Sequence, residues 1–378
     1  LNPKYVKAKM LLAEIDLRQR DFENAQKECA EVLALDPKNY RARMMLGNAL
    51  MAQGKNAEAE VAFKTLIAEK PENPVGYYRL GLLQRATKDY DGALDSFNAA
   101  LKRNPLLMDV FTNIVLVHAA KGDLDVALQK CDEQLARVGD SIVHKAMVNN
   151  LKGGLYLAQK NTKAAKTAFE TAIAENPDFM PPYYALARIY LSANQQQKAI
   201  DQYTAILDKN PDQAGPHMLL GTIYDMQKQY DMSEKHYRAA LEINPQFAPA
   251  ANNLAYLLSS RADHIDEALT FARIAKEKLP DDPSVMDTLG WIYYQKGLYG
   301  NAAQEFSDSL EKLPENATVN YHLGAALYQK GQKAQAESLL KKALALDGNF
   351  DGAEDCLLYT SDLPTRCHRC RSRWSPYH

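Results

Sequence analysis

Residues 289–314 read LGWIYYQKGLYGNAAQEFSDSLEKLP, and this stretch predicts two helices joined by a tight turn. The apolar spacing around Gly290 is that of one helix face, and Gly297 can take the left-handed conformation that ends a helix. Apolar residues recur at helical spacing from Ala302 onward, and Pro314 ends the second helix because proline cannot continue one. The stretch therefore predicts one antiparallel helix pair.

The same pattern repeats along the chain with a period of 34 residues, interrupted by one spacing of 38 and one of 35. The small residues that correspond to Gly290 are Ala13, Gly47, Gly81, Val115, Gly153, Ala187, Gly221, Ala255, Gly290 and Gly324. A second small residue follows each of them by twelve or thirteen positions, and a Pro or Gly follows twelve positions later. These registers predict an all-α fold, a right-handed α-solenoid of about ten stacked antiparallel helix pairs.

The residue types at these registers have a steric explanation. Gly or Ala is needed where one helix backbone approaches the other, because a larger side chain would push the pair apart. The order Leu-Gly-x-x-Tyr, then Ala, then an aromatic residue such as Phe306, then Pro resembles the tetratricopeptide repeat, over residues 1–355. This resemblance implies a binding module whose first helices line a concave surface.

The repeat pattern changes between repeats four and five. Four extra residues and Gly139 in place of a proline interrupt it, and Lys152 occupies a position that Leu normally holds. Four residues are close to one helical turn, so we expect a longer first helix near residues 140–158. The sequence thus divides into repeats one to four, residues 1–139, and repeats five to ten, residues 140–355, which continue the same solenoid.

Two smaller features concern the ends of repeats. One extra residue near Arg261 predicts a loop insertion, which repeat arrays tolerate on one face. Pro3 lies 34 residues before Pro37, so we expect a further repeat upstream.

The last 23 residues, 356–378, depart from the repeat pattern. Their possible zinc ligands are Cys356, Cys367, His368 and Cys370, ahead of an arginine-rich segment that could bind RNA. We favour another interpretation, because the codons that these residues imply resemble sequencing-library adapter in two separate places. The segment is therefore interpreted as a non-native, disordered tail.

Composition excludes several classes of function. Lys and Arg total 45 against 47 Asp and Glu, so no global positive field favours nucleic acid. No run of about 18 apolar residues is present, so no membrane span is predicted. The motifs of zinc proteases, phosphate-binding loops and serine hydrolases are absent, and we predict no enzyme, cofactor or metal site. Cys29 and Cys131 lie three repeats apart, too far for a disulfide, and we expect buried, inert thiols.

Two candidate patches follow from the positions of first helices that should face the groove. The first combines aromatic area with hydrogen-bonding groups and consists of Tyr184, Arg188, Met218, Asn252, Tyr256, Asp287, Trp291, Tyr294 and Tyr321. The second is smaller and consists of Met44, Asn48 and Tyr78, with Leu82 beside them. Such a wall suits an extended peptide, whose backbone needs polar partners and whose side chains need pockets. The alternative is that these residues only stack on one another inside the superhelix.

The sequence therefore predicts a non-catalytic scaffold that binds a protein or peptide segment in its concave groove. It resembles bacterial tetratricopeptide proteins of cell-envelope and exopolysaccharide assembly, most closely in residues 252–258 and 287–294. That resemblance favours a periplasmic or membrane-anchored location. The competing interpretation is the substrate-recognition arm of a larger enzyme, such as a glycosyltransferase.

Overall fold

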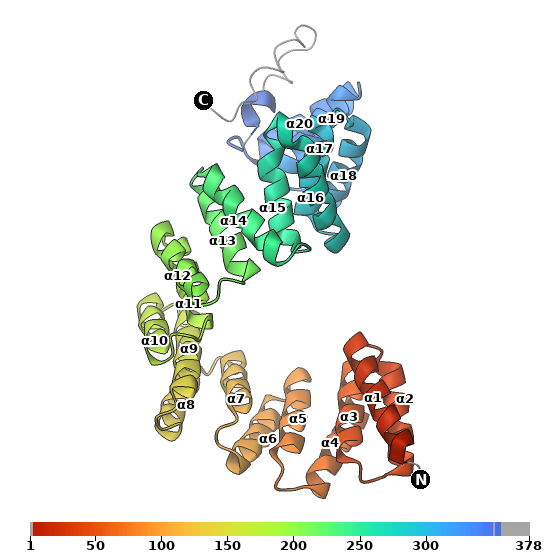
Figure 1. Cartoon of the computed structure of the whole chain (residues 1–378), viewed down its shortest axis with the longest axis vertical. Coiled ribbons are helices and arrows are strands. Elements are labelled where there is room, and N and C mark those ends of the chain that lie inside the picture. The colour runs from red at the N-terminus through yellow and green to blue at the C-terminus, as the bar shows by residue number, and fades with distance from the viewer. Residues whose placement is uncertain (1–2, 351, 357–378) are drawn as a thin grey trace. The chain divides into compact units, whose positions relative to one another are not determined.

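The computed structural model describes residues 3–350 and 352–356, which contain twenty α-helices, one 3₁₀-helix and no strand (Figure 1). The predicted all-α class is thus confirmed. The chain divides into two units of dense internal contacts, Leu1–Ile189 and Tyr190–His378. Each unit is described by itself below.

The first unit is a series of helix pairs. Its helices are α1 (Pro3–Gln19), α2 (Phe22–Leu35), α3 (Tyr40–Ala52), α4 (Asn56–Glu69), α5 (Pro74–Ala86), α6 (Tyr90–Arg103), α7 (Met108–Lys121), α8 (Leu124–Arg137), α9 (Ile142–Ala158) and α10 (Thr162–Glu175). Each odd-numbered helix packs against the even-numbered one that follows it, and neighbouring pairs also touch. The division between the units falls within α11 (Pro181–Ser192).

The second unit has the same construction. Its helices are α12 (Gln196–Lys209), α13 (Ala214–Met226), α14 (Tyr230–Ile243), α15 (Ala248–Ser259), η1 (Ala262–His264), α16 (Ile265–Lys278), α17 (Pro283–Gln295), α18 (Tyr299–Lys312), α19 (Ala317–Gln329) and α20 (Lys333–Leu346). The short η1 lies where the sequence predicts an insertion after Arg261.

Small residues form the contacts within each pair, as predicted. The second register consists of the small residues twelve or thirteen positions after those that correspond to Gly290. None of them has exposed surface; they are Ala25, Ala59, Ala93, Ala127, Ala165, Ala199, Ser233, Ala268, Ala302 and Ala336. A Cβ on Gly290 would lie only 2.7 Å from Cε1 of Phe306, so the two helix backbones can approach only because Gly290 has no side chain.

The turn within each pair depends on one residue with positive φ. Nine of the ten turns have one, namely Arg20, Gly54, Lys88, Gly122, Lys160, Asn194, Lys228, Gly297 and Gly331. In repeat eight, η1 replaces this residue, because the extra residue lets the chain turn with a 3₁₀ helix. A non-glycine residue costs about 1–2 kcal/mol in this conformation, so packing of the two helices must offset it.

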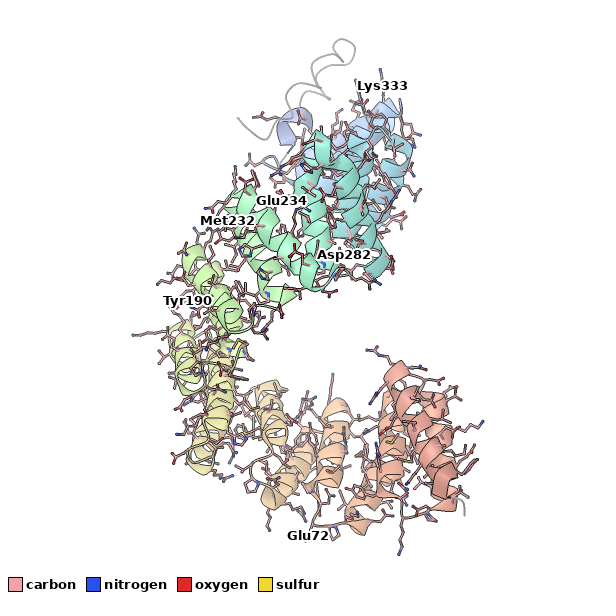
Figure 2. The ribbon with its side chains drawn as sticks, in the orientation of Figure 1. Glu72, Tyr190, Met232, Glu234, Asp282 and Lys333 are labelled. Atoms are coloured by element: carbon pink, nitrogen blue, oxygen red, sulfur yellow. The ribbon has the colours of Figure 1, made fainter. Side chains whose placement is uncertain are left out.

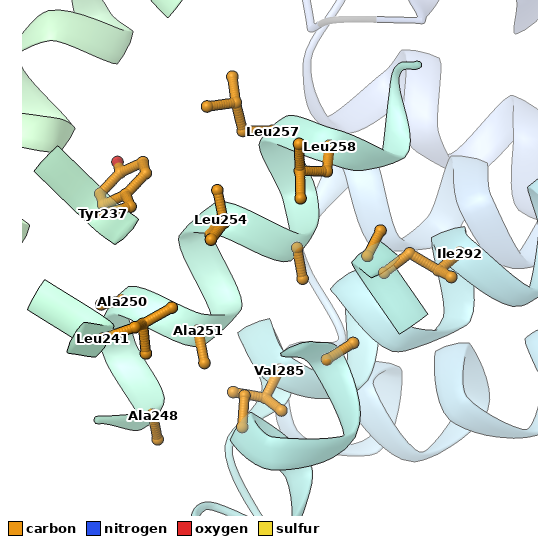
Figure 3. Packing of buried hydrophobic residues seen from close by; sticks show 14 of the residues in the cluster. Tyr237, Leu241, Ala248, Ala250, Ala251, Leu254, Leu257, Leu258, Val285 and Ile292 are labelled. Carbon is orange, nitrogen blue, oxygen red and sulfur yellow. The ribbon is translucent and has the colours of Figure 1, made fainter. Parts of the chain in front are cut away.

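Apolar side chains from three or more helices form each core cluster. Figure 3 shows Leu254 and Leu258 of α15 between Tyr237 of α14 and Ile292 of α17. Helix α17 begins at a cap in which Asp282, labelled in Figure 2, accepts hydrogen bonds from the backbone of the first turn. Burial between neighbouring pairs therefore fixes the stack, and the caps fix where each helix begins.

Helix α9 has 17 residues, as α1 does, and is longer than the other first helices, which confirms the expectation for repeat five. It has 17 residues against 13 in α5, and it begins at Ile142 after an N-cap at Ser141. The four extra residues thus lengthen the first helix at its N-terminal end.

Most of the predicted tail, residues 357–378, lies outside the described residues. Its first residue, Cys356, is buried and packs in the last core cluster beside Tyr321 and Leu340. The core of repeat ten therefore reaches one residue beyond the predicted boundary at 355.

Candidate functional site

First helices of the second unit lie side by side and carry most of the first predicted patch. Asn253 of α15 donates a hydrogen bond to Thr222 of α13, with Nδ2 and Oγ1 3.4 Å apart. His322 of α19 and Asp287 of α17 are joined in the same way, with Nδ1 and Oδ1 2.8 Å apart. The core cluster of α15 includes Ile292 of α17, which links the two middle helices. Residues at equivalent positions of α13, α15, α17 and α19 are therefore neighbours.

Asn252 and Tyr256 are one turn apart on α15, and of the two only Tyr256 is exposed. Tyr256 is 49% exposed although it is a large aromatic residue. Asn252 is partly buried, and its Oδ1 is shielded from solvent and has no hydrogen-bond partner among the described residues. A buried acceptor without a partner costs about 1–3 kcal/mol, so a donor that reaches it would gain that amount. Met218 of α13 is partly buried against the same core.

Trp291 does not project into a groove, contrary to our expectation. It is 9% exposed and belongs to a core cluster with Phe306 and Leu323. Its indole stacks on His322 at 4.5 Å between ring centroids, and on Tyr294 at 5.3 Å. The physical reason is that the flat imidazole of the next first helix covers one face of the indole. Asp287 is likewise engaged, because it holds His322.

Tyr321 is also a core residue, which corrects its place in the patch. It is 2% exposed and packs against Phe350 at 5.6 Å between ring centroids. The backbone of Gly352 lies so close that a Cβ there would be 2.6 Å from the tyrosine ring. The segment after α20 thus covers this side chain.

Tyr184 and Arg188, on α11, fall in the first unit by contact density. Tyr184 is partly buried and Arg188 is exposed. Burial raises the pKa of the Tyr184 hydroxyl. The other members of the first predicted patch belong to the second unit.

The second predicted patch is divided between two helix pairs. Met44 of α3 packs partly into the core formed with α4. Tyr78 of α5 lies 6.1 Å from Phe97 between ring centroids, and the Arg79 guanidinium lies over its ring. Asn48 has a buried Oδ1 without a hydrogen-bond partner among the described residues, as Asn252 does. These residues therefore pack mainly within their own pairs.

The two cysteines of the repeats are buried thiols, as predicted. Cys29 and Cys131 have no exposed surface and form no disulfide. Burial raises the pKa of each thiol to about 12. Both are therefore poor nucleophiles near neutral pH.

A histidine pair in repeat seven was not predicted. His217 of α13 and His236 of α14 have their Nδ1 atoms 3.0 Å apart, and His236 stacks on Tyr224. Burial, with a smaller contribution from His217, lowers the pKa of His236 to about 4. The sequence signal is weak, because the two residues are 19 positions apart on different helices of one pair.

Within residues 3–350 and 352–356 there is no cluster of three or more His, Cys, Asp or Glu side chains that could hold a metal ion. No helix in this part of the chain has both the length and the apolar character that crossing a bilayer requires.

Comparison with known proteins places the repeats in a family. A profile of the tetratricopeptide repeat matches residues 16–83, 156–223 and 293–354, and two further profiles of this repeat match residues 74–107 and 216–247. The cellulose synthase operon protein C of Xanthomonas axonopodis pv. citri is 24% identical over 200 residues, which are 50% of this chain and 13% of that protein. A TPR repeat-containing protein of Pseudomonas aeruginosa is 34% identical over 64 residues, 17% of this chain and 11% of that protein.

Solved structures are also similar. The Cut9–Hcn1 hetero-tetramer of the APC/C has a chain that is 13% identical, with a TM-score of 0.49 and coverage of 96% of this chain and 97% of its own. YrrB, described as a TPR protein with an unusual peptide-binding site, is 22% identical, with a TM-score of 0.41 and coverage of 51% and 99%. Since the first profile alone matches more than half of the 378 residues, the chain belongs to the tetratricopeptide repeat family.

Proposed function

We propose that the first helices of the second unit bind an extended segment of a partner protein, with α15 at the centre of the site. A tetratricopeptide array is a protein-interaction scaffold, and its repeats are typically non-catalytic. The finer assignment to α15 depends on Asn252 and Tyr256. Tyr256 offers an exposed aromatic surface, and Asn252 offers a buried acceptor.

The unpartnered Oδ1 of Asn252 is the single observation that carries this proposal. An extended peptide presents backbone N–H groups at regular intervals, and each needs an acceptor when it leaves water. A peptide N–H that reaches Asn252 would satisfy both groups at once. Tyr256, one turn away, would then cover an adjacent apolar side chain of the peptide.

The process in which this scaffold acts is proposed from similarity. The match to a cellulose synthase operon protein supports a role in bacterial envelope or exopolysaccharide assembly. The chain spans only 13% and 11% of the lengths of the two relatives. A second candidate, the non-catalytic arm of a larger enzyme, is therefore retained. A catalytic domain in the same complete reading frame would favour that candidate, whereas a secretion signal or lipid anchor would favour the envelope role.

The site can be tested with peptides selected on the full chain from a displayed library of random peptides. Asn252→Ala combined with Tyr256→Ala should weaken binding of the selected peptides about tenfold to a hundredfold, because a hydrogen bond and an aromatic contact are lost. Circular dichroism should show unchanged helicity. Tyr5→Ala is the matched control, because Tyr5 is also 49% exposed but lies on α1. Equal loss of binding in the control, or loss of helicity in the double variant, would contradict the proposal.

A further inference from the structure

A cavity of about 410 Å³ lies between α9 and α10, away from the predicted groove. Its polar lining residues are Asn149, Lys152, Tyr156, Asn161, Lys163, Thr167 and Thr171. On α9, Asn150 and Gly154 occupy the positions that Asn252 and Tyr256 hold on α15, and neither lines this cavity. The cavity is therefore on a different face of the helix from the peptide site that the family resemblance implies.

Lys152 is the residue that sets this cavity apart. The equivalent position in the nine other repeats is always Leu or Ile, namely Leu12, Leu46, Leu80, Ile114, Leu186, Leu220, Leu254, Leu289 and Leu323. The Lys152 side chain is only 18% exposed. Burying a lysine where a leucine fits costs free energy, and the ion pair with Asp132 offsets part of that cost.

Asn149, one turn before Lys152, is a buried polar side chain. It is 8% exposed and lines the cavity. Its equivalent in repeat ten, Asn320, donates hydrogen bonds to the backbone oxygens of Pro314 and Asn316. In repeat five, the residue that corresponds to Pro314 is Gly139. Gly139 lies four residues farther from Asn149 than Pro314 lies from Asn320. Because it lines the cavity, Asn149 is within reach of a ligand there.

The local charge is positive. Residues 141–169 contain five lysines and no Asp or Glu, although the whole chain has a net charge of −2. Lys152 forms an ion pair with Asp132 of α8, whose Oδ1 lies 2.7 Å from Nζ of Lys152 and whose side chain is 62% exposed. Lys163 has no ion pair among the described residues. Two ammonium groups and one carboxylate thus leave about one positive charge at the cavity.

We infer that this cavity binds a carboxylate of an acidic peptide, with Lys152 and Asn149 as the direct donors and Lys163 at the rim. Lys152 has three N–H donors, and Asp132 uses one of them. A monoanionic carboxylate matches the single net positive charge. A phosphate dianion would meet repulsion from Asp132 and lacks the arginine fork that such groups commonly use. This inference does not depend on the proposed peptide site of the second unit.

The experiment uses the full chain and a fluorescein-labelled hexaglutamate peptide, followed by fluorescence anisotropy at about 50 mM salt, where screening is weak. Lys152→Leu restores the residue of the other repeats, so it should fold, and it should weaken binding about tenfold or more because a charge-assisted hydrogen bond is lost. Asp132→Asn should tighten binding about threefold to tenfold, because Lys152 gains a free donor and a nearby negative charge is removed.

Lys64→Leu is the matched control. It removes the same charge from an exposed lysine of α4 that pairs with Glu60, and it should leave the affinity within about twofold of the parent. Unchanged binding by Lys152→Leu, or equal weakening by Lys64→Leu, would overturn the inference. Displacement of the peptide by inorganic phosphate or by oligothymidylate at lower concentration than by free glutamate would also overturn it, in favour of a phosphate or nucleic-acid ligand.

A last pair of variants keeps the two proposals apart. Asn252→Ala and Tyr256→Ala should not change the affinity for hexaglutamate. Weakening by those variants would show that the peptide binds the second unit and not the cavity, and would count against this inference alone.

Discussion

Helix pairs α9–α10 and α19–α20 occupy the same register of the repeat but present different chemistry. Each has a glycine at the crossing point, Gly153 and Gly324. Each also has a cavity on the same face, of about 410 Å³ and 520 Å³. The position before the glycine is Lys152 in the first pair and Leu323 in the second. Lys152 therefore lines the first cavity where Leu323 lines the second, although Lys330 also lies at the second.

The difference shows which positions define the backbone and which define function. The small residues are shared because any larger side chain would separate the helices. The residue beside them lines the cavity in both pairs, and it is Lys152 in one and Leu323 in the other.

The largest expected effect comes from exchanging the lysine and the leucine. Leu323→Lys should destabilise the second unit by about 2–4 kcal/mol, because Leu323 is 7% exposed and packs in a cluster with Trp291 and Phe306. Urea unfolding followed by circular dichroism, with hydrogen exchange of α17–α20, would measure the loss.

The reverse exchange is its control. Lys152→Leu should change stability by no more than about 1 kcal/mol, since it loses one partly exposed ion pair and gains apolar burial. If Lys152→Leu lowers stability as much as Leu323→Lys does, then positions 152 and 323 are not equivalent.

A smaller effect should distinguish the two crossing points. Gly153→Ala should cost about 1–2 kcal/mol, because a Cβ there would lie 2.4 Å from the rigid ring of Phe169 and helix propensity offsets only part of the clash. Gly324→Ala should cost less than Gly153→Ala, because its nearest neighbour is Cγ of Leu340 at 2.9 Å, and a leucine side chain yields more easily than an aromatic ring. Shifts of the urea midpoint would show which of the two variants loses more stability.

Gly154 supplies a control for this pair of variants. It is next to Gly153 on α9, and a Cβ there meets nothing within 4 Å. Gly154→Ala should therefore stabilise the chain by up to about 1 kcal/mol. Destabilisation by Gly154→Ala would show that the helices do not cross at Gly153.

The smallest expected effect is a loss of stability in acid. This loss should be larger in the second unit than in the helix pair α9–α10. The pKa of His236 is about 4 in the folded chain, against 6.5 in the unfolded chain. Below pH 6.5 the unfolded chain binds the proton first, so stability falls as the pH falls from 6.5 to 4 and is unaffected by this group outside that window. We expect a loss of about 1 kcal/mol, because His236 is only partly buried.

Hydrogen exchange of α13–α14 at pH 7 and pH 4.5 would measure this loss. His236→Gln should reduce the difference between the two pH values, because glutamine does not titrate. An equal difference in the variant would assign the acid sensitivity to the carboxylates instead.

Much of the fold could be predicted from periodicity. The small residues of the second register are all buried where the pattern placed them, and the longer α9 follows from four extra residues. The prediction rests on local sterics, because a 34-residue period with three agreeing registers leaves few ways to pack a helix pair.

The candidate site was harder to predict. Trp291 and Tyr321 lie at positions that normally face a groove, yet His322 and the segment around Phe350 cover them. Those covering residues come from a neighbouring repeat or from beyond the last helix, so the pattern within one repeat contains no information about them. Lys152 was visible as a departure from the pattern, but its meaning required the cavity.

The sequence by itself determined the helix pairs, their turns and the residues at which helices cross, because these depend on side-chain size and backbone conformation over a few tens of residues. Only the tertiary structure decided which groove-facing residues remain open, that Asn320 has two hydrogen-bond partners, and that His217 meets His236. Burial and hydrogen bonding between elements are set by neighbours distant in the chain, and no local pattern specifies them.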